Sequence, residues 1–348
     1  MEYRSVGASG LKVSPICLGT MMFGARTDEP EAARIVGRAR DAGVNFIDTA
    51  DYYAEGRGEA MVGDLIAADR DQWVVATKVG FRTGPGPNED GTNGLHLRAS
   101  VEQSLRNLHT DRIDLYYVHR DDPTTRLGET LRVVGDLIAA GKVIYWGLSN
   151  FRGWRVAEAI GVARELGLPA PIVVQPYYNA MNRQPEVELL PACAHFGLGV
   201  IPYSPLARGV LTGKYRPGQE PPPDSRAGRK DARMLETEWR PESLELVEKI
   251  RERASGRGMT PGQFALGWLL SNALITAVLA GPRTVEQLDE YLGTLDHAFD
   301  ADDAGFLDSL VPPGYASTFG YSDPQYPFTG RVQRDLVPAG DGTPLPKA

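Results

Sequence analysis

Short apolar runs recur along the chain at a nearly regular spacing. They occupy residues 16–18, 45–48, 73–78, 114–119, 143–149, 172–175, 199–203 and 276–280. The runs are apolar throughout and do not alternate with polar positions, which is typical of strands covered on both faces. Most of them begin about 30 residues apart, the length of a strand, a helix and two turns. The pattern therefore predicts eight parallel strands joined by helical connections.

Helical periodicity fills the intervals between these runs. Apolar residues recur at helical spacing in 31–42, 58–68, 97–108, 127–140, 154–166, 186–195 and 242–253. Eight alternating units favour an α/β fold of the (β/α)8 TIM barrel class over an open doubly wound sheet. An open dinucleotide-binding sheet would carry a G-x-G-x-x-G motif after its first strand, and the chain has no such motif.

Three further segments complete the predicted organisation. Residues 3–13 suggest an N-terminal hairpin at the barrel bottom, and residues 83–94 and 204–240 suggest insertions on the C-terminal face. An aromatic segment, 312–330, follows the last helix and could fold over the barrel mouth. We expect one domain over residues 1–330 and a flexible tail over 331–348. The uncharged run 264–281 predicts a buried helix entering a strand, in preference to a membrane span.

Composition narrows the functional classes. The 348 residues are 42% hydrophobic and 24% charged, which excludes a disordered chain, a coiled coil and a collagen-like fibre. The net charge of −8 and the absence of a basic stretch argue against nucleic acid and anionic membranes as partners. Two cysteines, Cys17 and Cys193, and the lack of a secretory pattern in residues 1–10 predict a reduced, cytoplasmic enzyme. No pattern indicates an oligomeric state.

Four ionisable residues fall at the ends of neighbouring predicted strands. Asp48 ends the second strand, Tyr53 follows it, Lys78 ends the third and His119 ends the fourth. Each alone has an ordinary structural explanation, such as a helix cap or a packed core side chain. Together, on the face where barrel enzymes keep their active sites, they predict a catalytic group.

The chemistry of these four residues suits proton transfer to a carbonyl. An ammonium beside a phenol stabilises the phenolate and lowers its pKa from about 10, so Tyr53 could protonate a developing alkoxide. Asp48 would keep Lys78 charged, and His119 could orient the carbonyl. A metal site, a two-carboxylate glycosidase and a phosphate-binding Walker loop each lack their ligands or spacing, so we predict no metal.

Ordered motifs around these residues resemble the aldo-keto reductase superfamily. They are "FIDTADYY", "ATK", "DLYYVHR", "YWGLSNF", "VQPYYN", "YSPLARGVLTGKY" and "AGPRTVEQLDEYL", which span most of residues 1–300. The opening "SGLKVSPICLGTMMFG" is closer to the bacterial general-reductase and potassium-channel β-subunit branches than to aldose reductases. The resemblance implies that Asp48, Tyr53, Lys78 and His119 are the catalytic residues.

The resemblance also implies a nicotinamide cofactor lying across the barrel mouth. Ser149, Asn150 and Gln175 would hold its carboxamide, and Tyr203 would stack on its ring. The pyrophosphate would be wrapped by Ser204, Leu206, Arg208, Gly209 and Lys214. The adenosine would lie against Gly281, Arg283, Thr284, Gln287 and Glu290, with Arg283 favouring NADPH over NADH. Tyr291 departs from the Asn common in related proteins, which leaves the adenine end less certain.

The substrate expected from this resemblance is a small aldehyde or ketone. Met21, Met22, Phe23, Phe81 and Tyr177 follow predicted strands and could form an apolar pocket, although the same residues could be rim packing. We therefore expect an NADPH-dependent oxidoreductase that reduces carbonyls with Tyr53 as general acid. The alternatives are a cofactor-binding regulatory protein, like a channel β subunit, and a non-redox barrel such as an isomerase.

Overall fold

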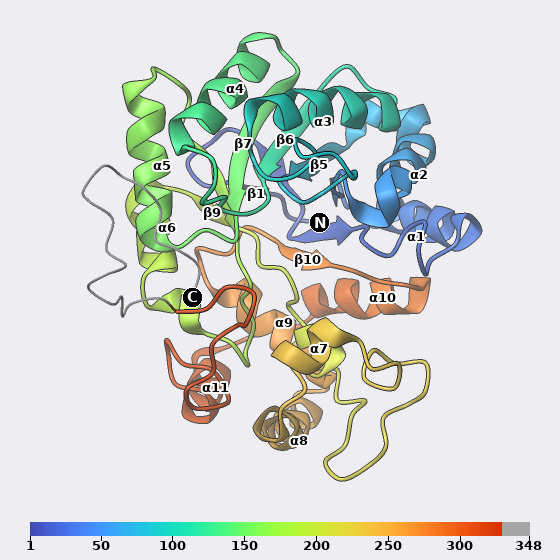
Figure 1. Cartoon of the computed structure of the whole chain (residues 1–348). Helices are drawn as coiled ribbons and strands as arrows, with labels where there is room; N and C mark the ends of the chain where they lie inside the picture. The colour runs from blue at the N-terminus through green and yellow to red at the C-terminus, as the bar shows by residue number, and fades with distance from the viewer. Residues whose placement is uncertain (329–348) are drawn as a thin grey trace.

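The computed structural model describes residues 1–328 and forms a barrel of parallel strands surrounded by helices (Figure 1). Eight strands follow the sheet order β10-β3-β4-β5-β6-β7-β8-β9. Their bounds are β3 Ile16–Gly19, β4 Phe46–Asp48, β5 Val74–Val79, β6 Ile113–Val118, β7 Val143–Ser149, β8 Val173–Gln175, β9 Gly199–Val200 and β10 Val278–Ala280. All eight predicted strands are confirmed within a few residues.

The sheet closes between β9 and the segment that leads into β10, the two ends of the strand order. β10 pairs with β3 in the register Val278 to Ile16. On the other side, Val200 of β9 forms a parallel bridge with Ile275, and the Thr276 amide donates to the Val200 carbonyl at 2.9 Å. Both edges are thereby joined, so the architecture is the predicted (β/α)8 barrel and not an open sheet.

Helices cover the outside of the sheet because one face of each is apolar. The barrel helices are α1 Glu29–Asp41, α2 Arg57–Ile66, α3 Gly94–Asn107, α4 Leu127–Ala139, α5 Gly153–Glu165, α6 Leu189–Phe196, α9 Pro261–Ser271 and α10 Val285–Gly293. The uncharged run 264–281 is indeed a buried helix, α9, that leads into β10. Within residues 1–328 no helix is long and apolar enough to cross a membrane.

Three helices lie outside the eightfold repeat. They are α7 Ala232–Thr237, α8 Pro241–Gly256 and α11 Ala301–Leu310. The insertion after β9, predicted over residues 204–240 without any helix of its own assigned, contains α7. Asp231 caps this short helix by accepting from the Met234 amide at 2.9 Å, which explains why a helix forms there. The predicted tail, 331–348, lies outside the described residues.

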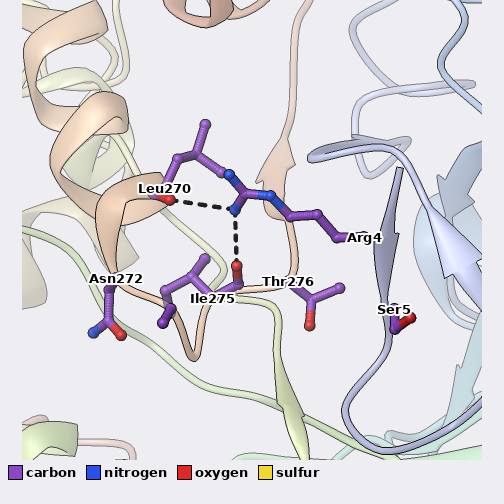
Figure 2. Close-up of a pocket in the computed structure, with 7 residues that line it drawn as sticks. Arg4, Ser5, Leu270, Asn272, Ile275 and Thr276 are labelled. Atoms are coloured by element: carbon purple, nitrogen blue, oxygen red, sulfur yellow. Dashed lines mark hydrogen bonds between the residues drawn. The ribbon is translucent and has the colours of Figure 1, made fainter. Parts of the chain in front are cut away.

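The N-terminal hairpin closes the end of the barrel opposite the strand C-termini. It consists of β1 Arg4–Ser5 and β2 Lys12–Val13, as the sequence predicts. Figure 2 shows the Arg4 side chain reaching across a hollow of about 370 Å³ towards α9. The guanidinium donates to the Leu270 carbonyl at 3.3 Å and to the Ile275 carbonyl at 3.0 Å. Arg4 thus satisfies the Leu270 carbonyl, which the end of α9 leaves without a helical partner, and the Ile275 carbonyl in the loop that follows.

Candidate active site

The four predicted catalytic residues come together at the C-terminal ends of β4, β5 and β6. The Lys78 ammonium donates to Asp48 and, at 2.6 Å, to the Thr49 carbonyl. It also lies 5.1 Å from the centre of the Tyr53 ring, on the ring face. The centres of the Tyr53 and His119 rings are 6.2 Å apart. One phenol, one imidazole and one ion pair therefore share a single buried site.

The ion pair at the base of the site is enclosed on all sides. Lys78 is 0% exposed and Asp48 is 1% exposed, and the Gln175 amide donates to the second oxygen of Asp48 at 3.0 Å. Burial raises the pKa of Asp48, whereas the positive charge of Lys78 and the hydrogen bond from Gln175 act against that rise. The carboxylate is thus held by two donors from different strands, which fixes its orientation.

The pKa of Tyr53 is shifted in the direction opposite to the one that the sequence suggested. Burial raises the pKa of Tyr53 well above its ordinary value, and the charges of Asp48 and Asp51 raise it further. Arg208 acts in the opposite direction. The lowering expected from Lys78 does not offset the rise caused by burial. These surroundings favour the protonated phenol, the form that can donate a proton.

The surroundings of His119 favour its neutral form. Burial lowers its pKa well below the ordinary value, and the neighbouring charges of Lys78 and Arg120 lower it further. Its Nδ1 is buried and has no hydrogen-bond partner among residues 1–328. A neutral imidazole carries one N–H that can donate to a carbonyl oxygen. Arg120 itself points away, donating to Asp90 at 2.6 Å, which agrees with a structural pairing.

An aromatic wall adjoins the imidazole. The ring centre of Phe81 lies 4.8 Å from that of His119, and the ring centre of Tyr52 lies 4.9 Å from that of Phe81. Tyr52 was overlooked in the sequence, although it adjoins Tyr53 in the "DTADYY" motif. Of the other predicted substrate-pocket residues, Phe23 is fully buried in the hydrophobic core and Met21 is 38% exposed. The pocket role of Met21, Met22 and Phe23 remains a prediction.

The residues predicted to hold the nicotinamide cluster next to the catalytic group. Asn150 donates to the His119 carbonyl at 2.8 Å, and its side-chain oxygen accepts from the Tyr203 hydroxyl at 2.8 Å. Ser149 donates to the Gln175 carbonyl at 2.9 Å. Tyr177 stacks on Tyr203 with ring centres 5.7 Å apart. The two ends of the Asn150 amide are thereby engaged, and this couples the predicted carboxamide site to His119.

Backbone strain marks the same region. Eight non-glycine residues within 1–328 adopt left-handed conformations, and three of these eight are Asn150 with φ of 60°, Ser204 with φ of 53° and Arg208 with φ of 51°. Such conformations cost about 1–3 kcal/mol each and concentrate at functional sites. All three belong to the predicted cofactor-binding set, so the strain supports a binding role for these loops.

A cluster of positive charge lies beyond Tyr203. Burial lowers the pKa of Lys214, and the nearby charges of Arg283, Arg226 and Arg229 add to this effect. Burial also lowers the pKa of Arg226, with Arg208 as the next cause. The basic cluster therefore comprises Arg208, Lys214, Arg226, Arg229 and Arg283. Such crowding of like charges is unfavourable unless an anion offsets it.

Two members of the basic cluster were overlooked in the sequence. Arg226 and Arg229 lie in the insertion "EPPPDSRAGRK", which was assigned no binding role. Two arginines three positions apart in this insertion were a signal that the sequence already contained. Arg208 Nε is buried and has no partner among the described residues, and the Lys214 ammonium lies against Gly209, where a Cβ would meet it at 2.8 Å. A side chain at position 209 would therefore collide with Lys214, and glycine avoids this contact.

The predicted adenosine segment forms the turn into α10. Thr284 caps this helix, and the Gln287 side chain accepts from the Arg283 amide at 2.8 Å. One helix N-terminal amide, that of Val285, already donates to Glu31 at 3.0 Å. This leaves less of the helix terminus free for a phosphate than the sequence implied. Glu290 accepts from Thr260 at 3.0 Å, and Tyr291 is buried.

Comparison with known proteins identifies the protein family to which the chain belongs. The model of the aldo/keto reductase family matches residues 15–312. A probable voltage-gated potassium channel subunit beta from Arabidopsis thaliana is 38% identical over 85% of this chain and 92% of its own length. An uncharacterized oxidoreductase from Bacillus subtilis is 36% identical over 92% of this chain and its full length. An L-glyceraldehyde 3-phosphate reductase from Escherichia coli is 33% identical over 90% of this chain and 93% of its length.

These matches confirm the resemblance and the branch inferred from the motifs. The matched region begins just before β3 and ends after α11, so it includes every strand of the barrel. Relatives of both kinds, channel subunits and oxidoreductases, align over most of the chain. This protein is a member of the aldo/keto reductase family and is similar to both its channel β-subunit and its bacterial oxidoreductase members.

Proposed function

We propose that the protein reduces aldehydes and ketones to alcohols with NADPH, and that Tyr53 donates the proton. The observation that carries this proposal is the arrangement of a buried phenol against an enclosed Lys78–Asp48 ion pair and beside an imidazole, in surroundings that favour the protonated phenol and the neutral imidazole. A donor of this kind is suited to an oxygen that becomes negative only during the reaction.

Each residue has a separate part in the reaction. The neutral His119 donates a hydrogen bond to the carbonyl oxygen and orients it towards Tyr53. As negative charge develops on that oxygen, the Tyr53 hydroxyl transfers its proton to it. Lys78 then stabilises the phenolate that remains, since its ammonium lies 5.1 Å from the centre of the ring. Asp48 holds Lys78 charged and in position throughout.

The residues around the site fit a phosphorylated nicotinamide cofactor. When bound, NADPH supplies the hydride. The basic cluster supplies the countercharge for its phosphates, which the unpartnered Arg208 Nε and the mutual repulsion at Lys214 both favour. Ser149, Asn150 and Gln175 would hold the carboxamide, and Tyr203 would support the ring. Arg283 is our candidate for the 2′-phosphate, and it is the reason we propose NADPH over NADH.

The substitution Tyr53→Phe tests this mechanism. It removes the hydroxyl and keeps the ring that packs against Lys78, so NADPH affinity measured by fluorescence titration should stay near the wild-type value. Carbonyl-dependent NADPH oxidation should fall by about 10²- to 10⁴-fold, the usual contribution of a general acid. Turnover near the wild-type rate with intact cofactor binding would remove Tyr53 from the mechanism.

A regulatory role is the second candidate, because relatives at 38% identity are named as probable potassium channel β subunits. In that role the barrel would bind NADPH tightly and turn over slowly. A panel of aldehydes separates the two functions. Rapid turnover of any member supports the enzyme, whereas slow turnover of all of them with tight binding supports the regulator. We propose a cytoplasmic location for either function.

A further inference from the structure

The side-chain amide of Asn150 joins three parts of the barrel mouth. Its Nδ2 donates to the His119 carbonyl, just after β6, at 2.8 Å and to Ser149 Oγ, at the end of β7, at 3.1 Å. Its Oδ1 accepts from the Tyr203 hydroxyl, in the segment after β9, at 2.8 Å. An amide side chain has two N–H donors and one acceptor oxygen. Both donors and the oxygen of Asn150 are therefore engaged by partners from different strands of the barrel.

The oxygen end of this amide depends on Tyr203. Within residues 1–328 the Tyr203 hydroxyl is the one group that donates a hydrogen bond to Asn150 Oδ1. Burial raises the pKa of Tyr203, which favours the protonated hydroxyl that can donate. Without this hydrogen bond the amide would be held at its nitrogen end alone, and it could turn about that end. The hydroxyl thus fixes the direction in which the Asn150 amide faces.

The ring of Tyr203 is held independently of its hydroxyl. The Tyr203 amide donates to the Pro176 carbonyl at 2.9 Å, and Tyr203 forms a parallel bridge with Tyr177. The two tyrosine rings stack with their centres 5.7 Å apart and their planes 24° apart. None of these contacts involves the hydroxyl, so the ring should keep its place when the hydroxyl is removed. The ring and the hydroxyl can therefore have separate tasks.

We propose that Tyr203 is a positioning residue, whose hydroxyl holds the Asn150 amide in the orientation that binds the nicotinamide carboxamide. The inference rests on the proposed function, because it assigns a task within the same cofactor site. Asn150 and Tyr203 are only partly buried, so a ligand can reach both. Because Asn150 also donates to the His119 carbonyl, one amide ties the carboxamide site to the residue that orients the substrate.

Tyr203→Phe tests this assignment, because it removes the hydroxyl and keeps the ring. The Kd for NADPH should rise by about three- to tenfold, the usual net effect of one hydrogen bond. The Kd for 2′,5′-ADP, which carries the adenosine and the 2′-phosphate but no nicotinamide, should not change. Quenching of protein fluorescence measures both. Tyr3→Phe is the matched control, since the Tyr3 hydroxyl donates to the Gly43 carbonyl at the opposite end of the barrel, and it should leave both Kd values unchanged.

Asn150→Gly shows whether the hydroxyl acts through the amide. Glycine adopts a φ of 60° without strain, so this change removes the amide and keeps the backbone. It should weaken NADPH binding at least as much as Tyr203→Phe, and the double variant should bind no more weakly than Asn150→Gly alone. An unchanged Kd for NADPH in Tyr203→Phe, or an equal rise with and without Asn150, would overturn this inference and leave the proposed function intact. A wild-type protein that oxidises NADPH with no aldehyde would contradict the proposed function itself.

Discussion

Lys78 and Asp48 form an ion pair that is cut off from solvent, with 0% and 1% of the two side chains exposed. Removing one partner leaves the other charge buried and unpaired. Lys78→Met should therefore lower the free energy of unfolding by about 3–5 kcal/mol. The double variant Asp48→Asn, Lys78→Met should lose less than the sum of the single changes. Urea denaturation of the three variants measures this coupling.

The exposed pair between Arg98 and Asp136 is the control for that experiment. Its side chains are 54% and 59% exposed. Arg98→Ala should cost less than about 1 kcal/mol, because water screens the attraction between exposed charges. Equal losses at the two pairs would mean that enclosure of Lys78 does not govern its contribution to stability.

Arg283→Ala should discriminate between the two nicotinamide cofactors. If its guanidinium binds the 2′-phosphate, the Kd for NADPH should rise about tenfold or more, and the Kd for NADH should hardly change. Arg226→Ala tests a residue of the basic cluster that the sequence did not reveal, and it should weaken NADPH binding most at low salt. Fluorescence titration measures each affinity, with Arg98→Ala as the control. Equal weakening of NADPH and NADH by Arg283→Ala would contradict the 2′-phosphate assignment.

The pH profile of reduction should depend on Asp51. Burial raises the pKa of Tyr53, and the charges of Asp48 and Asp51 raise it further, so we expect the Tyr53 proton to be lost at a higher pH than that of an ordinary phenol. The reduction rate should accordingly be flat from neutral to mildly alkaline pH and fall above that range. Asp51→Asn should move this fall to lower pH. The exposed Asp71, far from the site on the connection before β5, supplies the control Asp71→Asn. If the fall in rate at alkaline pH occurs at the same pH in Asp51→Asn as in the wild type, the Asp51 charge does not influence Tyr53.

Two helical glycines should respond oppositely to the same substitution. A Cβ at Gly63 of α2 would lie 2.6 Å from the Asn107 carbonyl oxygen and 2.8 Å from backbone atoms of Leu108. Gly63→Ala should destabilise the fold by about 1–3 kcal/mol, because backbone cannot yield easily. A Cβ at Gly37 of α1 meets nothing within 4 Å. Gly37→Ala should stabilise by about 0.5–1 kcal/mol. Thermal unfolding compares the two, and a similar effect at both sites would refute the packing argument.

The barrel could be predicted because its strands are buried on both faces. The runs around Ile16, Val143 and Val278 therefore stand out as apolar stretches with a common spacing. Helix α7 could not be found in this way, since its six residues are too few for a periodic signal and the Asp231 cap decides its start. Irregular segments such as residues 312–328 carry no period, so the contacts of Arg152 with the Tyr326 carbonyl and of Arg233 with Asp323 depend on tertiary placement alone.

The candidate site was predictable in its members and less so in its electrostatics. Strand ends place Asp48, Lys78 and His119 on one rim, which the order of the motifs already indicates. The pKa of Tyr53 depends on burial and on Asp51, and neither can be read from spacing. The sequence also did not reveal that Glu31 accepts a hydrogen bond from the Val285 amide, because these residues meet only when α1 packs against α10.

The pairing of β3 with β10 has a consequence for how the chain is made. As synthesis proceeds from the N-terminus, the free edge of β3 cannot find its partner until residues 278–280 have left the ribosome. The contacts of Glu31 with Val285 and of Arg38 with Asp289 wait for the same stretch. Until then the nascent sheet presents an unpaired edge to other chains. Ring closure is thus a late event, and the interval before it is when the growing protein most needs protection by chaperones.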